Sequence, residues 1–437
     1  MMLKVKMLKR CFLFLFIAVS FSSVSQNIQF DAKGLVFLSD ADMSAFSIID
    51  GNLRKMPDSK DVISTLSFPL NYGDPSQIVS DNASNSVLNS AKSLSITSNQ
   101  KLAYVLETKG QTGYSQTKYE DLIEDIPAGK YITVVNIENL KSPKSLYRFP
   151  VGTNPRAISL SPSNKLLAVS SEEYGKELQV FELDETGKPL RAIKKPNGFS
   201  PGRIVDLSWH SSGDYLIYLN QDEADLGVIK LVRDGPTNQV IRLEKFGNTV
   251  KIGGLITKGS FTPDGKYYIV LDKKKEAFDL ENKANGEVFI IKLNLDDEAG
   301  NHFLISRAPV GHNPFSFDIH PSGNYILVNN LEHSFLPPEH YLDSGESSLS
   351  VLHLNFNGTI ENIKNLKIDG ILPTSAVFDK DGQNVALSIF QYLTFGHSFG
   401  GIEFFQFNPT EKQILKFQKG KIYVPRGVHT LKPILDY

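Results

Sequence analysis

The sequence contains a single cysteine, Cys11, among its 437 residues. Because that residue lies near the N-terminus, the rest of the chain can form no disulfide and has no thiol for catalysis or metal binding. The sequence also lacks a glycine-rich phosphate loop, which argues against nucleotide-binding enzymes. Two segments match the letters G-x-S-x-G, GFSPG from Gly198 and GHSFG from Gly396. Neither lies between a predicted strand and a predicted helix, which is the context that the nucleophile turn of serine hydrolases requires.

The N-terminal segment has the three parts of a secretory signal peptide. Four basic residues, the last of them Arg10, precede an apolar run from Cys11 to Val19, and small residues follow at Ser23-Val24-Ser25. The pattern predicts a signal peptide over residues 1–25 and a mature chain over residues 26–437. The apolar run is too short for a stable membrane span and no second candidate follows. We therefore expect a periplasmic or secreted protein; a retained N-terminal anchor is the alternative.

The charge balance bears on the partner. The formal net charge is −2, and it becomes −6 when the four basic residues of the signal peptide are lost. A nucleic-acid partner needs a basic surface, so this balance argues against one. We expect a polar small molecule or a protein of the cell envelope as partner, a monomeric chain, and no cofactor other than a divalent cation.

One pattern recurs along the chain at spacings of roughly 50–60 residues. It consists of a short strand, a turn of Pro, Ser, Asp and Gly, and a second strand of aromatic and β-branched residues. The clearest copies are ISLSPSNKLLAVSS from Ile158, LSWHSSGDYLIYLN from Leu207, GSFTPDGKYYIVLD from Gly259 and FDIHPSGNYILVNN from Phe317. Repeats of this length are typical of propeller blades, so the pattern predicts an all-β propeller.

The blade count follows from seven inner strands, the last of which is RGVHTLKPIL from Arg426. Nothing follows this strand to complete a sheet, whereas Gly34–Ala41, Ala45–Asp50 and Val62–Leu70 are three predicted strands that lack a first. Pairing the C-terminal strand with the N-terminal three leaves no unpaired edge. We predict a seven-bladed β-propeller of four-stranded antiparallel blades; six or eight blades are the alternatives.

Long insertions fall in one class of loop, the connection between the second and third strands of a blade. They occupy Thr108–Gly129, Lys273–Gly286, Glu332–Ser347 and Gln391–Gly400. In a meander, all such loops emerge on one face of the propeller, which we call the elaborated face. Binding and chemistry usually lie on loops carried by a rigid scaffold, so this face is the predicted functional face.

Three segments resemble the lactonase-type seven-bladed propellers and the related YVTN-repeat propellers: FDIHPSGNYILVNNLEHS, SFTPDGKYYIVLD and the final VPRGVHTL. The resemblance covers essentially the whole mature chain and implies the propeller fold. It also implies Arg, His and Glu side chains at the mouth of the central channel. This chain has Phe315 and Ser316 in place of the Arg-His pair and Asn330 in place of the Glu. These departures favour a binding role over inherited lactone hydrolysis.

The favoured function is therefore an exported binding or scaffold module, which holds a polar ligand or a protein on the elaborated face. The alternative is lactone hydrolysis or lactone formation. In that reaction Arg156 and Arg203 would polarise the carbonyl group, while Glu332 and His429 would activate water.

A second alternative is a lyase acting on acidic polysaccharide. Such an enzyme needs a base beside an arginine that neutralises a uronate, and His397 with Tyr392 and Arg426 is the trio that would serve. The acidic net charge makes a long polyanionic substrate less attractive.

A ring of acidic residues is predicted at the channel mouth, because acids follow the second strand of most blades. Like-charged carboxylates at close range can have raised pKa values suited to acid–base chemistry. Solvated loop ends are the alternative interpretation. From this ring and from its neighbours, the predicted ligand-binding residues are Glu107, Glu172, Asp272, Arg426, His333 and His397.

The segment NQDEADLG from Asn220 is a candidate cation site. It places Asp222, Glu223 and Asp225 within four residues, and hard cations such as Ca²⁺ prefer such oxygen ligands. The segment lacks the glycine and the closing bidentate acid of the twelve-residue calcium loop. A plain acidic turn is the alternative.

Overall fold

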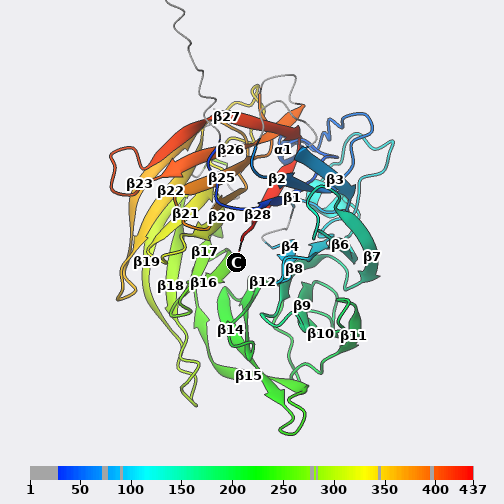
Figure 1. Cartoon of the computed structure of the whole chain (residues 1–437), viewed down its shortest axis with the longest axis vertical. Helices are drawn as coiled ribbons and strands as arrows, with labels where there is room; N and C mark the ends of the chain where they lie inside the picture. The colour runs from blue at the N-terminus through cyan, green and yellow to red at the C-terminus, as the bar shows by residue number, and fades with distance from the viewer. Residues whose placement is uncertain are drawn as a thin grey trace, which may run out of the picture.

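The structure is a computed structural model, and it describes residues 28–70, 77–88, 92–275, 280–281, 284–342, 346–393 and 398–436. These residues form seven four-stranded antiparallel sheets arranged around a common axis (Figure 1). The predicted seven-bladed propeller is therefore confirmed. The predicted signal peptide, residues 1–25, lies outside the described residues.

Each blade is a meander whose first strand lies nearest the axis. Blade one contains β28 (Val428–Ile434), β1 (Gly34–Ser39), β2 (Val62–Ser67) and β3 (Ile78–Asn82). Blade two contains β4 (Leu94–Ile96), β5 (Leu102–Leu106), β6 (Tyr131–Asn136) and β7 (Lys144–Pro150). Blade three contains β8 (Pro155–Leu160), β9 (Leu166–Ser171), β10 (Gln179–Leu183) and β11 (Pro189–Ala192). Blade four contains β12 (Ile204–Trp209), β13 (Tyr215–Asn220), β14 (Asp225–Arg233) and β15 (Val240–Lys251).

The remaining blades follow the same order. Blade five contains β16 (Ile256–Phe261), β17 (Tyr268–Asp272), β18 (Asn285–Lys292) and β19 (Phe303–His312). Blade six contains β20 (Pro314–Ile319), β21 (Tyr325–Asn330), β22 (Ser347–Leu354) and β23 (Ile360–Ile368). Blade seven contains β24 (Ser375–Phe378), β25 (Asn384–Ile389), β26 (Phe399–Phe407) and β27 (Leu415–Pro425).

The repeated turn joins the first two strands of a blade. In blade five, Gly265 has a φ of 69°, a left-handed conformation that glycine adopts without the steric penalty of a side chain. Its N–H donates to the carbonyl of Thr262 at 2.8 Å, and Asp264 Oδ1 accepts the N–H of Lys266 at 3.0 Å. The strand that follows, β17, is buried along its whole length. The turn chemistry thus starts a strand whose side chains fill the space between blades.

The ring closes through the two ends of the chain, as predicted. Strand β28 pairs with β1 in antiparallel register, with Gly34 opposite Ile434 and Leu38 opposite His429. The N–H of Lys33 also donates to the carbonyl of Ile434 at 2.7 Å. The C-terminal strand is thus the innermost strand of the blade that the N-terminal segment builds.

The prediction of a strand over Ala45–Asp50 is wrong. Ser47–Asp50 forms the short helix α1, and Gly51 ends it in a left-handed conformation with φ of 68°. Phe46 and Ile49 pack into the cluster of loop residues described below, which lies outside the blade. The outer strand of blade one is instead β3, which lies further along the chain and was not predicted. Tertiary packing decides the structure of this apolar segment, because its β-forming residues bury as well on a helical turn.

The insertion loops pack against one another on the elaborated face. Apolar residues from the loops of blades one, two, six and seven form a common buried cluster, which we call the loop cluster. The helices α1 and α2 (Leu122–Asp125) both contribute to it. Its buried members are Met43, Ala45, Phe46, Leu53, Val87, Leu88, Leu122, Ile126, Leu331, Phe335, Leu336, Ile371, Leu372 and Phe390. The elaborated face therefore has a hydrophobic core of its own.

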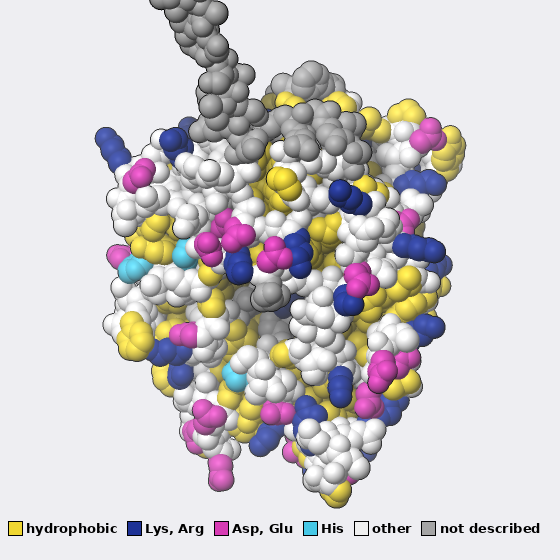
Figure 2. Space-filling model, viewed as in Figure 1, with side chains coloured by type: hydrophobic (Ala, Val, Ile, Leu, Met, Phe, Trp, Pro, Cys, Tyr) yellow, Lys and Arg dark blue, Asp and Glu magenta, His cyan; other side chains and the backbone are white. Residues whose placement is uncertain are grey.

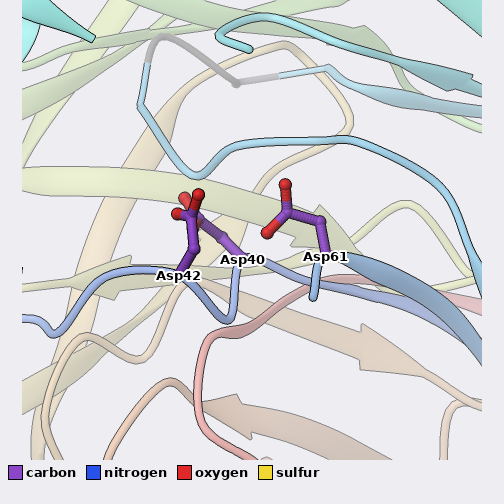
Figure 3. A group of neighbouring side chains, drawn as sticks. All are labelled: Asp40, Asp42 and Asp61. Atoms are coloured by element: carbon purple, nitrogen blue, oxygen red, sulfur yellow. The ribbon is translucent and has the colours of Figure 1, made fainter. Parts of the chain in front are cut away.

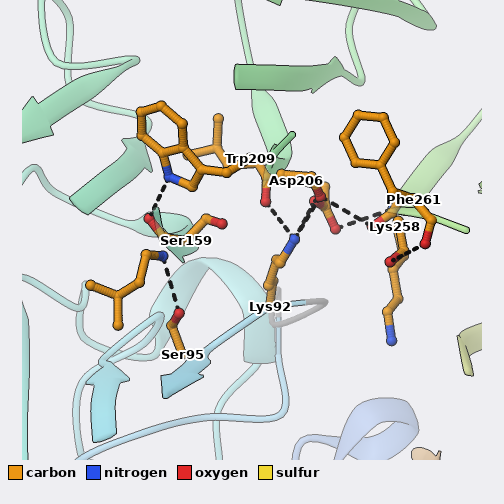
Figure 4. A network of polar contacts seen from close by, with 12 residues as sticks. Lys92, Ser95, Ser159, Asp206, Trp209, Lys258 and Phe261 are labelled. Carbon is orange, nitrogen blue, oxygen red and sulfur yellow. Dashed lines mark hydrogen bonds and ion pairs between the residues drawn. The ribbon is translucent and has the colours of Figure 1, made fainter. Parts of the chain in front are cut away.

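Polar contacts cross between the inner strands (Figure 4). Lys92, before β4, forms an ion pair with Asp206 of β12 at 3.2 Å, and Asp206 also accepts the N–H of Gly259 in β16. Trp209 of β12 donates its indole N–H to the carbonyl of Ser159 in β8 at 3.0 Å, which joins blade four to blade three. These bonds join blades two, three, four and five near the axis, and the sequence did not predict the Lys92–Asp206 pair.

Candidate functional site

A cavity of about 990 Å³ opens at the channel mouth on the elaborated face. We call it the mouth cavity. Its described lining comes from the beginnings of inner strands, from residues that directly follow second strands, and from the insertion loops. Its volume lies within the range of small-molecule sites in proteins. The elaborated face is therefore hollowed at the position where the blades converge.

Two arginines and two acids form a chain along part of the lining. Arg156 Nε in β8 lies 2.9 Å from Oε1 of Glu172, which directly follows β9. Arg203 Nε lies 3.4 Å from the same oxygen and 3.8 Å from Asp222 Oδ1. The backbone N–H of Arg203 also donates to Asp222 Oδ2 at 2.8 Å. Burial lowers the pKa of Arg156 and the charge of Glu172 opposes that change, so the guanidinium stays charged at neutral pH.

Another part of the lining is apolar. It belongs to the loop cluster and to the beginning of β20, so the same residues that hold the loops together also face the cavity. The apolar lining residues of this part are Ile48, Ile49, Val87, Leu88, Leu280, Phe315, Leu331, Phe335 and Leu372. The cavity thus offers charge on one part of its wall and hydrocarbon on another.

Two lysines also line the cavity. Lys109 Nζ donates to the carbonyl of Ile123 at 2.6 Å. Lys273 directly follows β17 and reaches toward blade six, where its Nζ lies 5.4 Å from the centre of the Phe315 ring. Burial alone lowers the pKa of Lys273 to about 8.

The four residues predicted to act on a lactone lie in different environments. Arg156 and Arg203 share Glu172 in the mouth cavity. Glu332 accepts the hydroxyl of Ser348 at 2.6 Å, outside the described lining of the cavity. The structure therefore brings the two arginines together and gives the predicted carboxylate another partner.

His429 is completely buried inside blade one. Its Nε2 lies 2.8 Å from Asn85 Oδ1, and its Nδ1 lies 2.9 Å from the hydroxyl oxygen of Thr430. Burial lowers the pKa of His429 to about 3, so the imidazole is neutral. Both ring nitrogens serve contacts within the blade, and His429 is not part of the described cavity lining.

The predicted ring of acids consists mostly of residues that hold backbone N–H groups. Asp272 is fully buried and accepts the N–H groups of Leu255 at 2.6 Å and of Gly254 at 3.1 Å. Glu107 accepts the N–H of Lys130 at 2.9 Å. A carboxylate after the second strand thus fixes a neighbouring segment of backbone. Of the three predicted ligand-binding acids, only Glu172 is in the described lining.

The other predicted ligand-binding residues are dispersed. Arg426 is buried and its Nη2 donates to the carbonyl of Arg54 at 2.6 Å; burial lowers its pKa to about 10. His333 is buried with its ring centre 4.7 Å from that of His312. His397 lies outside the described residues.

Tyr392, the third member of the predicted lyase trio, donates its hydroxyl to Glu403 at 2.8 Å. Burial, followed by the charge of Glu403, raises the pKa of Tyr392 above its ordinary value. Neither Tyr392 nor Arg426 is in the described lining of the mouth cavity.

The predicted cation ligands have separate partners. Asp222 accepts the N–H of Arg203, and Glu223 forms an ion pair with Lys251 at 3.0 Å. Asp225 lies 3.7 Å from the same lysine. Lysine and arginine groups thus neutralise the acidic turn at Asn220.

A different group of carboxylates converges in blade one (Figure 3). One oxygen each from Asp40, Asp42 and Asp61 lies within 4.8 Å of the other two. Burial raises the pKa of Asp40 well above its ordinary value, and the charge of Asp42 adds to the effect. The pKa of Asp61 is raised by burial and then by both neighbours. Among the described residues, these three carboxylates are close enough together to bind one shared cation.

The face seen in Figure 2 carries basic and acidic side chains side by side. No continuous basic track crosses the described residues of this face. The two helices in the described ranges have four residues each, so neither is long enough to cross a membrane.

Comparisons with known proteins relate the fold to solved structures. No family model matches the chain, and no curated protein matches its sequence. The periplasmic gluconolactonase PpgL of Pseudomonas aeruginosa is similar in structure, with a TM-score of 0.60 at 12% identity over 92% of this chain and 99% of that one. A Bacteroides uniformis protein provisionally assigned as a 6-phosphogluconolactonase has a TM-score of 0.59 at 14% identity, with 92% and 99% coverage. A Desulfotomaculum acetoxidans protein of unknown function has a TM-score of 0.56 at 13% identity, also with 92% and 99% coverage.

These likenesses show the class of fold. The chain has the architecture of the lactonase-type seven-bladed propellers, as the repeated segments predicted. Identities of 12–14% carry no activity from one chain to another, because propellers host binding, hydrolysis and lyase chemistry alike.

Proposed function

We propose that the protein is a binding protein that holds a small organic molecule in the mouth cavity. The observation that carries the proposal is the cavity itself: about 990 Å³, with an apolar part from the loop cluster and a charged part from Arg156, Glu172, Arg203 and Asp222. A mostly apolar pocket with a few convergent polar groups is the usual form of a ligand site.

The charged part suits recognition better than proton transfer. Glu172 forms ion pairs with two guanidinium groups, so both of its neighbours are hydrogen-bond donors rather than proton acceptors. No histidine is found among the described lining residues. The chain of alternating charges can donate and accept hydrogen bonds along a polar edge of a ligand.

The test is a melting-temperature screen of residues 26–437 against sugar lactones, sugar acids and amphipathic organic acids. A ligand present at a hundred times its Kd stabilises the protein by roughly 2.7 kcal/mol. We expect Arg203→Ala to weaken binding of a hit about tenfold, since one charge-assisted contact is lost. Arg242→Ala is the matched control, because Arg242 is exposed and pairs only with Glu244 on β15. Equal effects of both variants would contradict the proposal.

Lactone hydrolysis is the second candidate, and the fold likeness to PpgL is the observation that favours it. Arg156 and Arg203 would polarise the carbonyl, while Glu332 and His429 would have to leave their present partners to activate water. Release of acid from gluconolactone above the spontaneous rate, lost in Glu332→Gln, would support this candidate. A rate equal to the spontaneous one would support binding without turnover.

We also propose that the chain is exported. The basic, apolar and small-residue segments of residues 1–25 support this, as does the periplasmic location named for PpgL. The test is cell fractionation with the mass of the mature N-terminus, for which we expect Gln26. An unprocessed chain in the cytoplasmic fraction would contradict it.

A further inference from the structure

Lys273 is a cation without an acidic partner in the mouth cavity. The two arginines of the lining, Arg156 and Arg203, are neutralised by Glu172 and Asp222. Among the described residues, no carboxylate lies within 4.0 Å of Lys273 Nζ, and the ring of Phe315 is the group that the ammonium faces. Lys274, the next residue, turns away and pairs with Glu287. Of the two lysines that line the cavity, Lys109 donates to the carbonyl of Ile123, whereas Lys273 has no ion pair among the described residues.

The position of this charge is unfavourable for the empty protein. A charged group that leaves bulk water without a paired acid destabilises the fold. Burial is the sole cause of the lowered pKa of Lys273, which means that no described charge compensates it. The ring of Phe315 offers only a weak cation–π attraction at this distance. A ligand that supplies negative charge would remove the penalty.

We propose that the ligand is an amphipathic organic anion, whose acidic group pairs with the ammonium of Lys273 and whose apolar part packs against Phe315, Phe335 and Leu372. The inference rests on the proposed function, because it assigns the class of molecule that the mouth cavity takes. It concerns charge selection, whereas the proposed function concerns occupancy of the cavity.

The preference for an anionic ligand follows from the charged residues that line the cavity. Glu177 of the lining pairs with Lys195. The remaining charged lining residues besides Lys273 are three cations and three acids, so as a set they do not discriminate between anions and neutral molecules: Lys109, Arg156, Arg203, Glu124, Glu172 and Asp222. A neutral ligand would expel water from Lys273 and leave the ammonium without a partner. A cationic ligand would add repulsion. Of these three classes of ligand, Lys273 therefore favours only the anionic one. The apolar residues beside it favour a ligand with an apolar body.

The test uses two fluorescent probes with the same ring system. Anilinonaphthalene sulfonate is an amphipathic anion, and phenylnaphthylamine is its neutral counterpart. Both are titrated into the chain over residues 26–437, into Lys273→Met, and into Lys275→Met. Lys275 is exposed and two residues further on, so its variant has the same change of charge.

We expect the sulfonate to bind the unmodified protein about tenfold more tightly than the neutral probe, since one ion pair in a partly enclosed site supports a difference of that size. Lys273→Met should remove this preference and leave the affinity of the neutral probe unchanged within about twofold. Lys275→Met should retain the preference. Equal binding of both probes to the unmodified protein, or a preference that survives in Lys273→Met, would overturn the inference.

A third variant separates failure of the inference from failure of the proposed function. Ile48 lies on α1 at the surface and lines the cavity, so Ile48→Asp introduces a charge into the apolar part without disturbing a blade core. We expect it to weaken both probes. If it weakens neither, the probes bind elsewhere and the proposed function fails; if it weakens both while Lys273→Met has no effect, only the charge assignment fails.

A melting scan shows whether Lys273→Met is folded. Because the substitution removes a partly buried charge that has no described acidic partner, the variant should melt at or above the temperature of the unmodified protein. A lower melting temperature would contradict the premise that Lys273 lacks a partner in the empty cavity.

Discussion

At the scale of single residues, the molecule handles buried acids in two ways. Asp272 accepts hydrogen bonds from three backbone N–H groups, those of Gly254, Leu255 and Lys274. Asp40 and Asp61 face one another and Asp42, and burial raises the pKa of both. A carboxyl group whose pKa is raised on folding stabilises the fold while protonated. That contribution is lost as the pH rises from about 3.9 through the raised value.

Asp40→Asn imitates the protonated acid. Both hydrogen bonds to Asp40, from Ser86 and Val87, reach the single oxygen Oδ2, so an amide oxygen can accept both. We expect the variant to be more stable than the unmodified protein at pH 8, by on the order of 1 kcal/mol, and equal to it near pH 4. Thermal unfolding at the two pH values measures the difference. Asp58→Asn, at an exposed position, should show none; equal melting of Asp40→Asn and the unmodified protein at pH 8 would contradict the argument.

Sequence reasoning identified the arginines of the site but not their context. Arg156 and Arg203 were predicted to act together on one carbonyl group, and they do meet at Glu172. The isolation of Lys273 was not predictable, because it depends on where blades five and six place their acids. Likewise, the hydrogen-bond partner of His429 Nε2 is Asn85, which is 344 residues away in the chain. Local pattern indicates which residues reach the mouth; only the packed blades determine their partners.

At the scale of elements, the turns and their strands were predictable, whereas the loops were not. Each turn with its glycine and the alternating strand after it is a local pattern, and the blades follow these patterns. The segment Ala45–Asp50 has the same apolar composition but forms α1, because Phe46 and Ile49 pack with other loops. The loop cluster forms only when several insertions pack together, so the sequence of one insertion does not predict it.

The loop cluster should open independently of the blades. Phe335 is buried within it and also lines the mouth cavity. We expect Phe335→Ala to destabilise the cluster by about 3 kcal/mol, and to increase hydrogen exchange in the loops around Leu53 and Leu122 while the blade strands stay protected. Hydrogen exchange with mass spectrometry measures this.

Phe289→Ala is the comparison for that experiment, because Phe289 is buried between blade strands. It should instead increase exchange in the strands of blade five. If Phe335→Ala increased exchange uniformly over the whole chain, the loop cluster and the blades would form one cooperative unit, contrary to the prediction.

At the scale of the whole molecule, stability depends on the closing strand. Removal of residues after Pro425 takes away β28, which leaves β1 without its inner partner and exposes neighbours of Val428 and Leu431. We expect this variant to lose its cooperative unfolding transition, because the first and last blades then have free edges. Circular dichroism during heating measures the transition.

A chain that ends at Leu435 is the control for this truncation, since it retains β28 and, among the contacts of the described residues, loses the surface ion pair of Asp436 with Lys33. It should unfold as the unmodified protein does. A sharp, unshifted transition in the shorter variant would show that the ring does not require closure.

The same closure sets an order of events during biogenesis. Blade one contains β1, β2 and β3 together with β28, which begins almost 400 residues after β1 in the sequence. The ring therefore cannot close until β28 has been synthesised, so a nascent chain stays open along one edge. A chain that crosses a membrane N-terminus first would remain in this open state until β28 arrives, and would acquire its mouth cavity only on the far side.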